Sequence, residues 1–250
     1  MSQHRNVTCG IPQGSILGPL LFILHINDLP MGLNHCKVSM YADDTLLYCE
    51  GTDLNELCSK VNKDLKYVNL WLKQNKLSLN IAKTEYILLG SRSRLNKISD
   101  LNVNTEINGK ELKRVKSCKH LGMIIDENLT WQDHVLKIQK KTSSGLYMLR
   151  KVKQYVNSST LKLVYNALVS SHLNYCDVVW DNCGITLTNK LQKIQNRGAR
   201  IINNSPWHSS GRENISRLNW QTLGDKRKDN IAIMMFRILN SQAPTYKPLL

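Results

Sequence analysis

The apolar positions of the chain first follow the period of strands and then that of helices. The segment "KVSMYADDTLLYCE", residues 37–50, alternates apolar and polar side chains around a central Tyr-Ala-Asp-Asp. That alternation predicts a strand, a tight turn and a second strand, with the two aspartates at the tip of the hairpin. From Leu54 to Leu72 the apolar residues recur in steps of three and four, which predicts an amphipathic helix packed by one stripe.

The other segments of the first half are shorter. A turn near Gly14 precedes a helix predicted at about 18–29, whose apolar run "LLFILHI" is too short to cross a membrane and suggests a buried helix. We expect two short strands around a polar link at 80–83. Another strand is predicted at 118–126, with a bend at Gly122.

Beyond residue 126 the helical period replaces the strand pattern. Apolar residues recur every three or four positions, with basic residues between them. The expected fold class is therefore α+β, with strands and helices in 1–126 and helices alone in 127–250. The helices are predicted at about 135–152, 160–172, 187–202 and 225–240, with a loop at 204–214.

The charge is unevenly distributed along the chain. The chain has 34 Lys and Arg against 19 Asp and Glu, a net charge of +15. Residues 1–126 contribute 16 minus 12, or +4, and residues 127–250 contribute 18 minus 7, or +11. Such an excess favours a polyanionic partner such as nucleic acid, although charged helix faces are also commonly just solvated.

The cysteines indicate a reducing compartment. There are seven, an odd number, and none forms a Cys-x-x-Cys pair. A zinc site from His172, Cys176 and Cys183 is conceivable, but the spacing matches no common zinc motif. With no secretory signal in the sequence, we expect an intracellular protein of the nucleus or cytoplasm, not a secreted or membrane one.

Asp43 and Asp44 are the main candidates for chemistry. Two adjacent carboxylates repel each other, and a bound cation would offset that repulsion. Mg²⁺ takes one or two carboxylates and completes its shell with water and phosphate oxygens, and two such ions serve phosphoryl transfer. The simpler interpretation is that both aspartates only form the turn.

Several blocks of the chain resemble one family in the expected order. "GIPQGSILGPLLFILHINDLP", "YADD", "LSLNIAKTEYILLG" and "CKHLGMIIDENLTWQDHV" are similar to motifs B, C, D and E of the reverse transcriptases of non-LTR (LINE-type, jockey-like) retrotransposons. "KLQKIQNRGARII" resembles the helix that follows in the same elements. The resemblance implies the C-terminal part of a polymerase palm in 1–126, a small antiparallel sheet backed by helices. It implies a basic, thumb-like helical region in 127–250.

The resemblance also implies an activity and its ligands. The activity is RNA-directed DNA polymerisation, in which a primer hydroxyl attacks a dNTP on an RNA template with two Mg²⁺ ions. Asp43 would bind the metals and Asp44 would support the same site. The other implied roles are nucleotide binding by Gln13, Gly14, Tyr41 and Ala42, leaving-group neutralisation by Lys83, and a primer grip at His120, Leu121 and Gly122.

One part of the family pattern is absent. Motif A, which supplies another metal-binding aspartate, precedes motif B, and this chain begins close to motif B. Asp28, Asp53 and Asp64 are expected at helix ends or on helix surfaces. We therefore expect a truncated chain that is inactive by itself, and the alternative function is a remnant that only binds RNA or an RNA–DNA duplex.

Some residues keep two interpretations. Lys83 is either the leaving-group lysine or one of many solvated charges. Trp131 and Trp207 could stack on bases, although Trp131 is also suited to closing the junction between palm and thumb.

Overall fold

The computed structural model describes residues 14–98 and 104–243. The chain forms two compact units, which we call the first unit, Met1–Leu88 with Arg92–Val115, and the second unit, Leu89–Ser91 with Lys116–Leu250. The main division between the units falls between Val115 and Lys116. The boundary predicted from the sequence lies at 126/127.

The first unit contains the predicted hairpin. Strands β1 (Lys37–Tyr41) and β2 (Asp44–Tyr48) pair antiparallel and are joined by the two residues Ala42 and Asp43. The strand–turn–strand prediction is confirmed. One face of the hairpin, which includes Met40 and Leu47, packs against a buried cluster.

Helix α2 (Leu54–Gln74) supplies most of the core of the first unit. Asp53 caps its N-terminus by accepting the N–H of Glu56 at 2.8 Å. The helix confirms the stripe predicted from the sequence. Its apolar side chains enter two small clusters, which are Ile26, Leu29, Val68 and Trp71 in one and Leu65, Ile107 and Leu112 in the other.

Helix α1 (Gly18–Ile26) differs from its prediction. It begins with Pro19 in its first turn, as expected, and is followed by the 3₁₀ helix η1 (Leu29–Gly32). The prediction of a buried helix is wrong, since Leu20, Ile23 and Leu24 are 54%, 55% and 65% exposed. The reason is that α1 is apolar around its whole circumference, whereas only one side of it packs on the core.

The remaining strands of the first unit are very short. Strand β3 (Glu85–Tyr86) follows the 3₁₀ helix η2 (Ile81–Lys83) and pairs in parallel with β6 (Lys113–Arg114). Strands β4 (Glu106–Ile107) and β5 (Lys110–Glu111) form an Asn-Gly hairpin, and α3 covers Arg92–Ile98. Instead of the expected single antiparallel sheet, the described residues form separate two-stranded sheets, one of them parallel. Strands of two residues are too short to extend a ladder.

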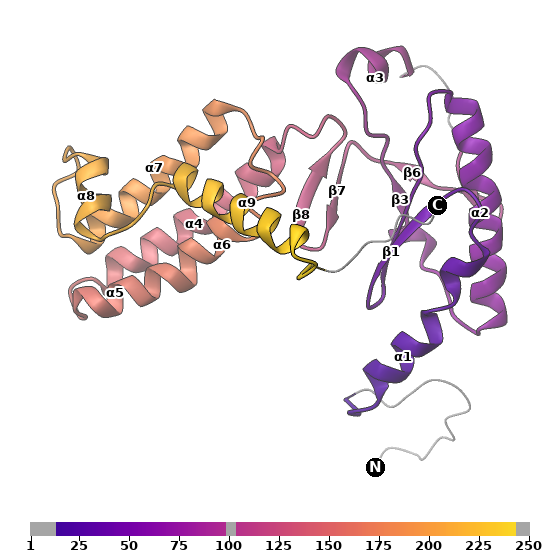
Figure 1. Ribbon diagram of the computed structural model, residues 1–250, viewed down its shortest axis with the longest axis horizontal. Helices are drawn as coiled ribbons and strands as arrows, with labels where there is room; N and C mark the ends of the chain where they lie inside the picture. The colour runs from indigo at the N-terminus through magenta and orange to yellow at the C-terminus, as the bar shows by residue number, and fades with distance from the viewer. Residues whose placement is uncertain (1–13, 99–103, 244–250) are drawn as a thin grey trace. The chain divides into compact units, whose positions relative to one another are not determined.

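The second unit begins with a hairpin and continues as helices (Figure 1). Strands β7 (Ser117–His120) and β8 (Met123–Asp126) pair antiparallel. All four predicted helices are present. They are α4 (Gln132–Val152), the continuous stretch α5 (Ser158–Tyr165), η3 (Asn166–Ser170, a π-turn) and α6 (Ser171–Asn174), then α7 (Ile185–Ile202) and α9 (Leu223–Leu239).

A further helix, α8 (Gly211–Arg217), occupies part of the predicted loop 204–214. Its start was readable in the sequence, because Ser210 is followed three residues later by Glu213, as in a capping box. The Ser210 hydroxyl accepts the N–H of Glu213 at 3.4 Å.

Close helix packing in the second unit depends on two glycines. A Cβ at Gly145 of α4 would lie 2.6 Å from the Leu168 carbonyl oxygen, and one at Gly198 of α7 would lie 2.3 Å from the Tyr165 ring. The glycines therefore let α4 and α7 approach the helical stretch α5–η3. The result is one continuous core that runs from Trp131 to Leu223.

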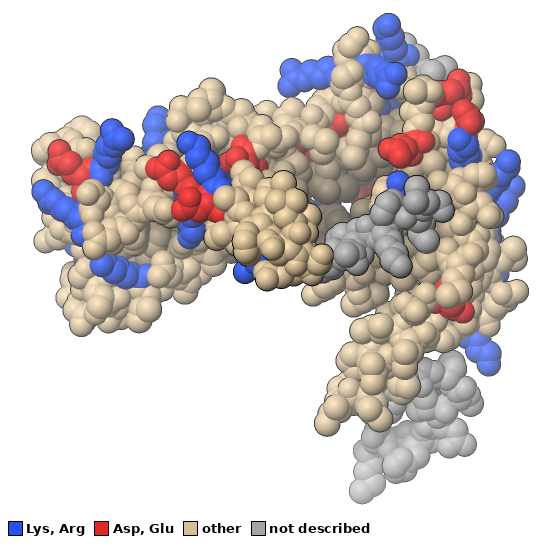
Figure 2. All heavy atoms as spheres, in the orientation of Figure 1, with Lys and Arg blue, Asp and Glu red and all other residues tan. Residues whose placement is uncertain are grey.

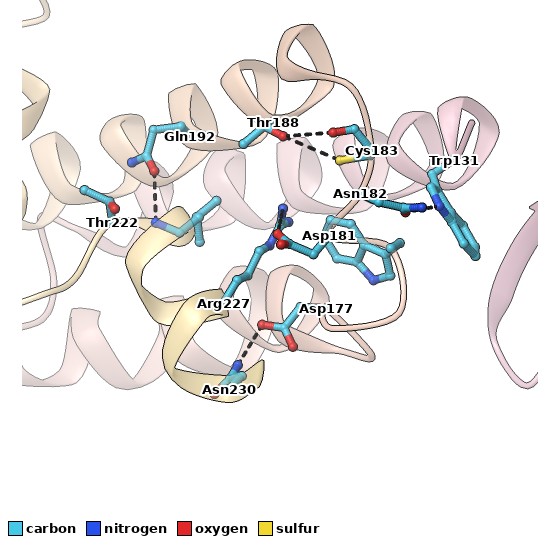
Figure 3. A network of polar contacts seen from close by, with 12 residues as sticks. Trp131, Asp177, Asp181, Asn182, Cys183, Thr188, Gln192, Thr222, Arg227 and Asn230 are labelled. Carbon is cyan, nitrogen blue, oxygen red and sulfur yellow. Dashed lines mark hydrogen bonds and ion pairs between the residues drawn. The ribbon is translucent and has the colours of Figure 1, made fainter. Parts of the chain in front are cut away.

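Polar contacts connect α9 to the rest of the second unit (Figure 3). The Arg227 guanidinium is buried 4.1 Å above the Trp180 ring and lies 3.3 Å from an Asp181 carboxylate oxygen. Gln192 of α7 accepts the N–H of Leu223 at 3.0 Å, which satisfies a free donor at the start of α9. These contacts set the position of α9 on α7.

No helix among the described residues is long and apolar enough to cross a membrane.

Candidate functional site

The turn of the β1–β2 hairpin has a backbone geometry that suits glycine but contains alanine. Ala42 has a φ of 53°, whereas the φ of Asp43 is not positive. This pattern of signs is that of a type II′ turn, one of the two turns that match the twist of a two-residue hairpin. A left-handed φ costs a residue with a Cβ about 1–2 kcal/mol, so the tip carries some backbone strain.

Both aspartates of the tip are exposed and unpaired. Asp43 is the second turn residue, and Asp44 is the first residue of β2, directly opposite Tyr41. Within residues 14–98 and 104–243, no hydrogen bond or ion pair engages either carboxylate. An aspartate that only forms a turn typically accepts a hydrogen bond from its own backbone two residues on, and neither does so here.

The carboxylates therefore have free oxygens for a cation. One or two carboxylates are what a Mg²⁺ site usually takes from a protein, with water and phosphate oxygens completing the shell. Among the described residues, no group of three or more His, Cys, Asp or Glu side chains gathers as a metal site. That result also excludes the zinc site considered for His172, Cys176 and Cys183.

The outer face of the hairpin is aromatic. Tyr41 and Tyr48 are 67% and 51% exposed, and they alternate with the side chains that face the core. Tyr41 lies opposite Asp44 and so on the same face. The nucleotide-binding role that the family resemblance implied for Tyr41 stays a prediction.

The other nucleotide-binding candidates are only partly described. Gly14 lies in a turn with a φ of 83°, which a residue with a side chain rarely adopts. Ala42 is the strained turn residue of the hairpin. Gln13 lies outside the described residues.

Lys83 is the last residue of the 3₁₀ helix η2 and is exposed. The side chain of Asn80 accepts the N–H of Lys83 at 3.3 Å, and the Asn80 carbonyl accepts the Thr84 hydroxyl at 3.0 Å. The backbone of the turn is thus held while the ammonium group stays in solvent. In the described part of the chain, no ion pair joins Lys83 to either tip aspartate.

The predicted primer-grip residues form the turn of the β7–β8 hairpin. Leu121 and Gly122 have φ values of 43° and 84°, as in a type I′ turn, and His120 pairs with Met123. The Tyr175 hydroxyl donates to the Leu121 carbonyl at 2.7 Å. The Lys137 ammonium donates to the Gly122 carbonyl at 2.6 Å.

A buried histidine supports the same hairpin. His134 of α4 is 3% exposed, and its Nδ1 accepts the N–H of Ile124 at 3.3 Å. Its ring makes edge contacts with Trp131 and Trp180, at centroid distances of 6.5 and 5.5 Å. Burial lowers the pKa of His134, and the charge of Lys137 lowers it further, so the imidazole is neutral in the folded chain.

Asp126, the last residue of β8, organises the turn into α4. It accepts the backbone N–H groups of Asn128, Thr130 and Trp131 at 3.2, 2.9 and 2.7 Å. Burial raises the pKa of Asp126, but these hydrogen bonds outweigh burial and lower it. Leu129 and Trp131 adopt positive φ in this turn, which the carboxylate helps to stabilise.

Trp131 and Trp207, the two candidates for base stacking, differ in exposure. Trp131 is 5% exposed, and its indole N–H donates to the Asn182 side chain at 2.6 Å. A buried ring is not available for base stacking. Trp207, by contrast, is 86% exposed.

The predicted exposure of Asp64 is wrong. Expected on a helix surface, it is 1% exposed and accepts the N–H groups of Asn34, His35 and Cys36 at 3.2, 2.9 and 2.6 Å. Burial raises its pKa, but the hydrogen bonds lower it. The signal was its position within the apolar stripe of α2, four residues before Val68. Its role is to hold the segment that leads into β1.

Comparisons with known proteins agree with the motifs. Residues 1–125 match the family model described as reverse transcriptase (RNA-dependent DNA polymerase). The chain is 25% identical over 238 residues to the RNA-directed DNA polymerase from mobile element jockey of Drosophila funebris, covering 91% of the chain and 25% of the relative. No solved structure is significantly similar to the chain.

Two further relatives are of the same kind. The probable RNA-directed DNA polymerase from transposon BS of Drosophila melanogaster is 26% identical, covering 89% of the chain and 25% of the relative. The Pol polyprotein from type-1 retrotransposable element R1 2 of Nasonia vitripennis is 27% identical, covering 68% of the chain and 43% of the relative. The chain spans about a quarter of the length of the first two relatives. It belongs to the reverse transcriptase family and, within it, to the RNA-directed DNA polymerases of non-LTR retrotransposons of the jockey and R1 kind.

Proposed function

We propose that the chain carries the motif B to motif E part of an RNA-directed DNA polymerase that extends a primer on an RNA template. In this proposal residues 1–126 belong to the palm and residues 127–250 form a basic, thumb-like region. The observation that carries the proposal is the pair of exposed, unpaired carboxylates of Asp43 and Asp44 at the β1–β2 tip. The family match supports it.

The proposed roles follow from the geometry of the tip. Asp43 and Asp44 would hold Mg²⁺ through their free oxygens. Bound Mg²⁺ would supply positive charge to the reacting phosphate and the attacking hydroxyl. Tyr41, on the face of Asp44, would contact the primer end or the nucleotide. Lys83 offers a mobile cation for the charge of the leaving pyrophosphate.

We propose further that the 250-residue chain does not polymerise by itself but still binds nucleic acid. The resemblance assigns another metal-binding aspartate to motif A, and no third acidic side chain joins Asp43 and Asp44 among the described residues. The basic helices of the second unit support phosphate contacts that are salt-sensitive and not sequence-specific.

Primer extension tests the catalytic proposal. The purified chain would be given a DNA primer on an RNA template with Mg²⁺ and dNTPs, beside the double variant Asp43→Ala/Asp44→Ala. The matched control is Asp28→Ala, which removes an exposed carboxylate elsewhere in the first unit. We expect no incorporation, with salt-sensitive duplex binding retained. Incorporation that disappears only in the double variant would overturn the proposed inactivity and support the tip as the catalytic site.

Metal binding tests the site without requiring turnover. Mn²⁺, used as a paramagnetic stand-in for Mg²⁺, should broaden the amide NMR signals of Tyr41, Asp43 and Asp44. The broadening should vanish in the double variant and persist in Asp28→Ala. Unchanged tip signals at millimolar Mn²⁺ would exclude the tip as a metal site of this chain.

A further inference from the structure

A basic pocket in the second unit is not used by the proposed polymerase site. It lies between the end of α4, the outer face of α7 and the segment before α8, with a volume of about 710 Å³. We define the basic pocket by six of its lining side chains, which are Arg150, Lys153, Lys193, Arg197, Arg200 and Trp207.

The charge of this pocket is of one sign. One cation comes from α4, one is the residue that caps its C-terminus, Lys153, and three come from α7; no acidic side chain lines the pocket among the described residues. Elsewhere on the helical unit the signs are mixed, as the basic and acidic side chains around α7 to α9 in Figure 2 show. In the part of the chain that the structure describes, no ion pair neutralises any of the five cations.

The pocket is held in shape by contacts of its own rim. The Arg200 Nε donates to the Ser209 carbonyl at 2.9 Å, and the Lys153 ammonium donates to the Asn204 side chain. Both contacts connect a pocket cation to the segment that carries Trp207. The inner face of α7 is fixed separately, because Gln195 donates to the Gln221 carbonyl at 2.9 Å.

Trp207 is the exception among the tryptophans. Trp71, Trp131 and Trp180 are at most 6% exposed, and Trp220 stacks on Tyr165 with a centroid distance of 4.6 Å. Trp207 is 86% exposed and lines the pocket beside the cations. An exposed indole next to several arginines and lysines offers a stacking surface and phosphate contacts together.

We propose that the basic pocket binds a single-stranded nucleic acid, with one base stacked on Trp207 and the flanking phosphates on the α4 and α7 cations. The strand must be unpaired because the bases of a duplex are stacked on each other and present only their edges. Stacking tolerates any base, so the pocket does not select a sequence. The proposal specifies the nucleic-acid binding proposed above for the basic helices and rests on it, but it needs neither metal nor dNTP, so its failure is distinguishable from a failure of the polymerase site.

Binding of short oligomers tests this proposal. The full chain would be titrated with fluorescein-labelled 12-nucleotide oligo-U and oligo-dT without divalent metal. We expect salt-dependent binding that quenches the Trp207 fluorescence, and Trp207→Ala should weaken it about tenfold or more. The control Trp220→Phe, which changes a half-buried ring stacked on Tyr165, should keep both the affinity and the quenching.

A matched pair of charge variants tests the phosphate contacts. Lys193→Gln removes a pocket cation, whereas Lys190→Gln removes an exposed lysine of the same helix that does not line the pocket. For single strands the slope of log K against log salt is about −0.7 per phosphate contact, so Lys193→Gln should reduce its magnitude by about 0.7. Lys190→Gln should leave the slope unchanged.

The outcomes separate the possible ligands. Binding of oligo-U or oligo-dT that is tighter than binding of the duplex supports the proposal. The tighter of the two oligomers then identifies RNA or DNA as the ligand. A duplex that binds as tightly as the single strands, with Trp207→Ala without effect on either, would overturn it. So would a Trp207→Ala variant that alters only self-association or binding to another protein.

Discussion

The two hairpins that carry candidate site residues have similar backbones but different surroundings. Both have two-residue turns in which a residue with a side chain adopts positive φ, Ala42 in β1–β2 and Leu121 in β7–β8. The carbonyls of the β7–β8 turn are anchored by Tyr175 and Lys137 from the helical part of the second unit. At the β1–β2 tip, no described hydrogen bond or ion pair engages the aspartates.

One hairpin is thus held by hydrogen bonds within its own unit, whereas the carboxylates of the other are free to bind a ligand. Side chains of the β7–β8 region make their hydrogen bonds inside the protein, as Asp126 illustrates with its three backbone N–H partners. The carboxylates at the β1–β2 tip keep their oxygens available for a ligand. A polar group that binds a ligand at an exposed tip has to keep its hydrogen-bonding capacity free, whereas most buried polar groups are hydrogen-bonded within the protein.

The largest expected effect comes from removing Asp126, which holds the turn that leads from β8 into α4. Asp126→Ala deletes the acceptor of three backbone N–H groups in a turn with two positive φ values. We expect the free energy of unfolding to fall by about 2–3 kcal/mol, measured by urea denaturation. The double variant Asp43→Asn/Asp44→Asn should change it by less than about 0.5 kcal/mol. Equal losses in both variants would contradict the comparison.

The second effect is a dependence of stability on pH. Because burial and Lys137 depress the folded pKa of His134 below 6.5, the unfolded chain binds a proton that the folded chain does not. The stabilisation is complete above pH 6.5 and is lost as the pH falls from 6.5 through the folded pKa, at up to about 1.4 kcal/mol per pH unit. Urea denaturation of the second unit at pH 7.5 and 5.5 measures it.

His134→Gln is the control for the pH effect. It should flatten the dependence and leave the part due to His172, whose pKa is lowered by burial and by Lys141 and Lys137. Amide exchange in β1–β2 should not follow the same profile, since no described hydrogen bond connects that hairpin to a histidine side chain. An undiminished slope in His134→Gln would rule out His134 as its source.

The smallest effect concerns the strain at the candidate catalytic tip. Ala42→Gly removes the cost of a positive φ but increases the freedom of the unfolded chain, so we expect a net gain of about 0.5 kcal/mol. Slower amide exchange of Tyr41 and Asp44 would report it. Ala42→Val should have the opposite sign, because a β-branched residue tolerates this φ least. A loss of protection in Ala42→Gly would show that the tip is unstrained.

Local patterns predicted much of the fold. The hairpin at residues 37–50 and the helix from Leu54 were readable because a period of two or of 3.6 residues reflects the element itself. Two further local signals are present in the sequence. Asn108-Gly109 corresponds to the β4–β5 hairpin, and Ser210 with Glu213 corresponds to the start of α8. The exposure of α1 was not readable, because hydropathy does not show how much of a helix finds a partner.

The candidate site divides in the same way. The sequence predicted that Asp43 and Asp44 lie at a tip, and the turn geometry agrees. It could not predict that Tyr175 would hold the Leu121 carbonyl from 54 positions away along the chain. Nor could it distinguish the buried Asp64 from an ordinary helix aspartate, since its three partners come from a segment that precedes β1.

The family, the order of the motifs and the period of the main elements can be read from the sequence alone, because they depend on neighbouring residues. Which polar groups are satisfied within the protein, and which stay free for a ligand, is set by the tertiary fold. That outcome depends on contacts between distant segments, as when α4, α7 and the segment before α8 bring Arg150, Arg197 and Trp207 to one pocket. The same amino acids on differently packed helices would be only solvated charges and an exposed ring.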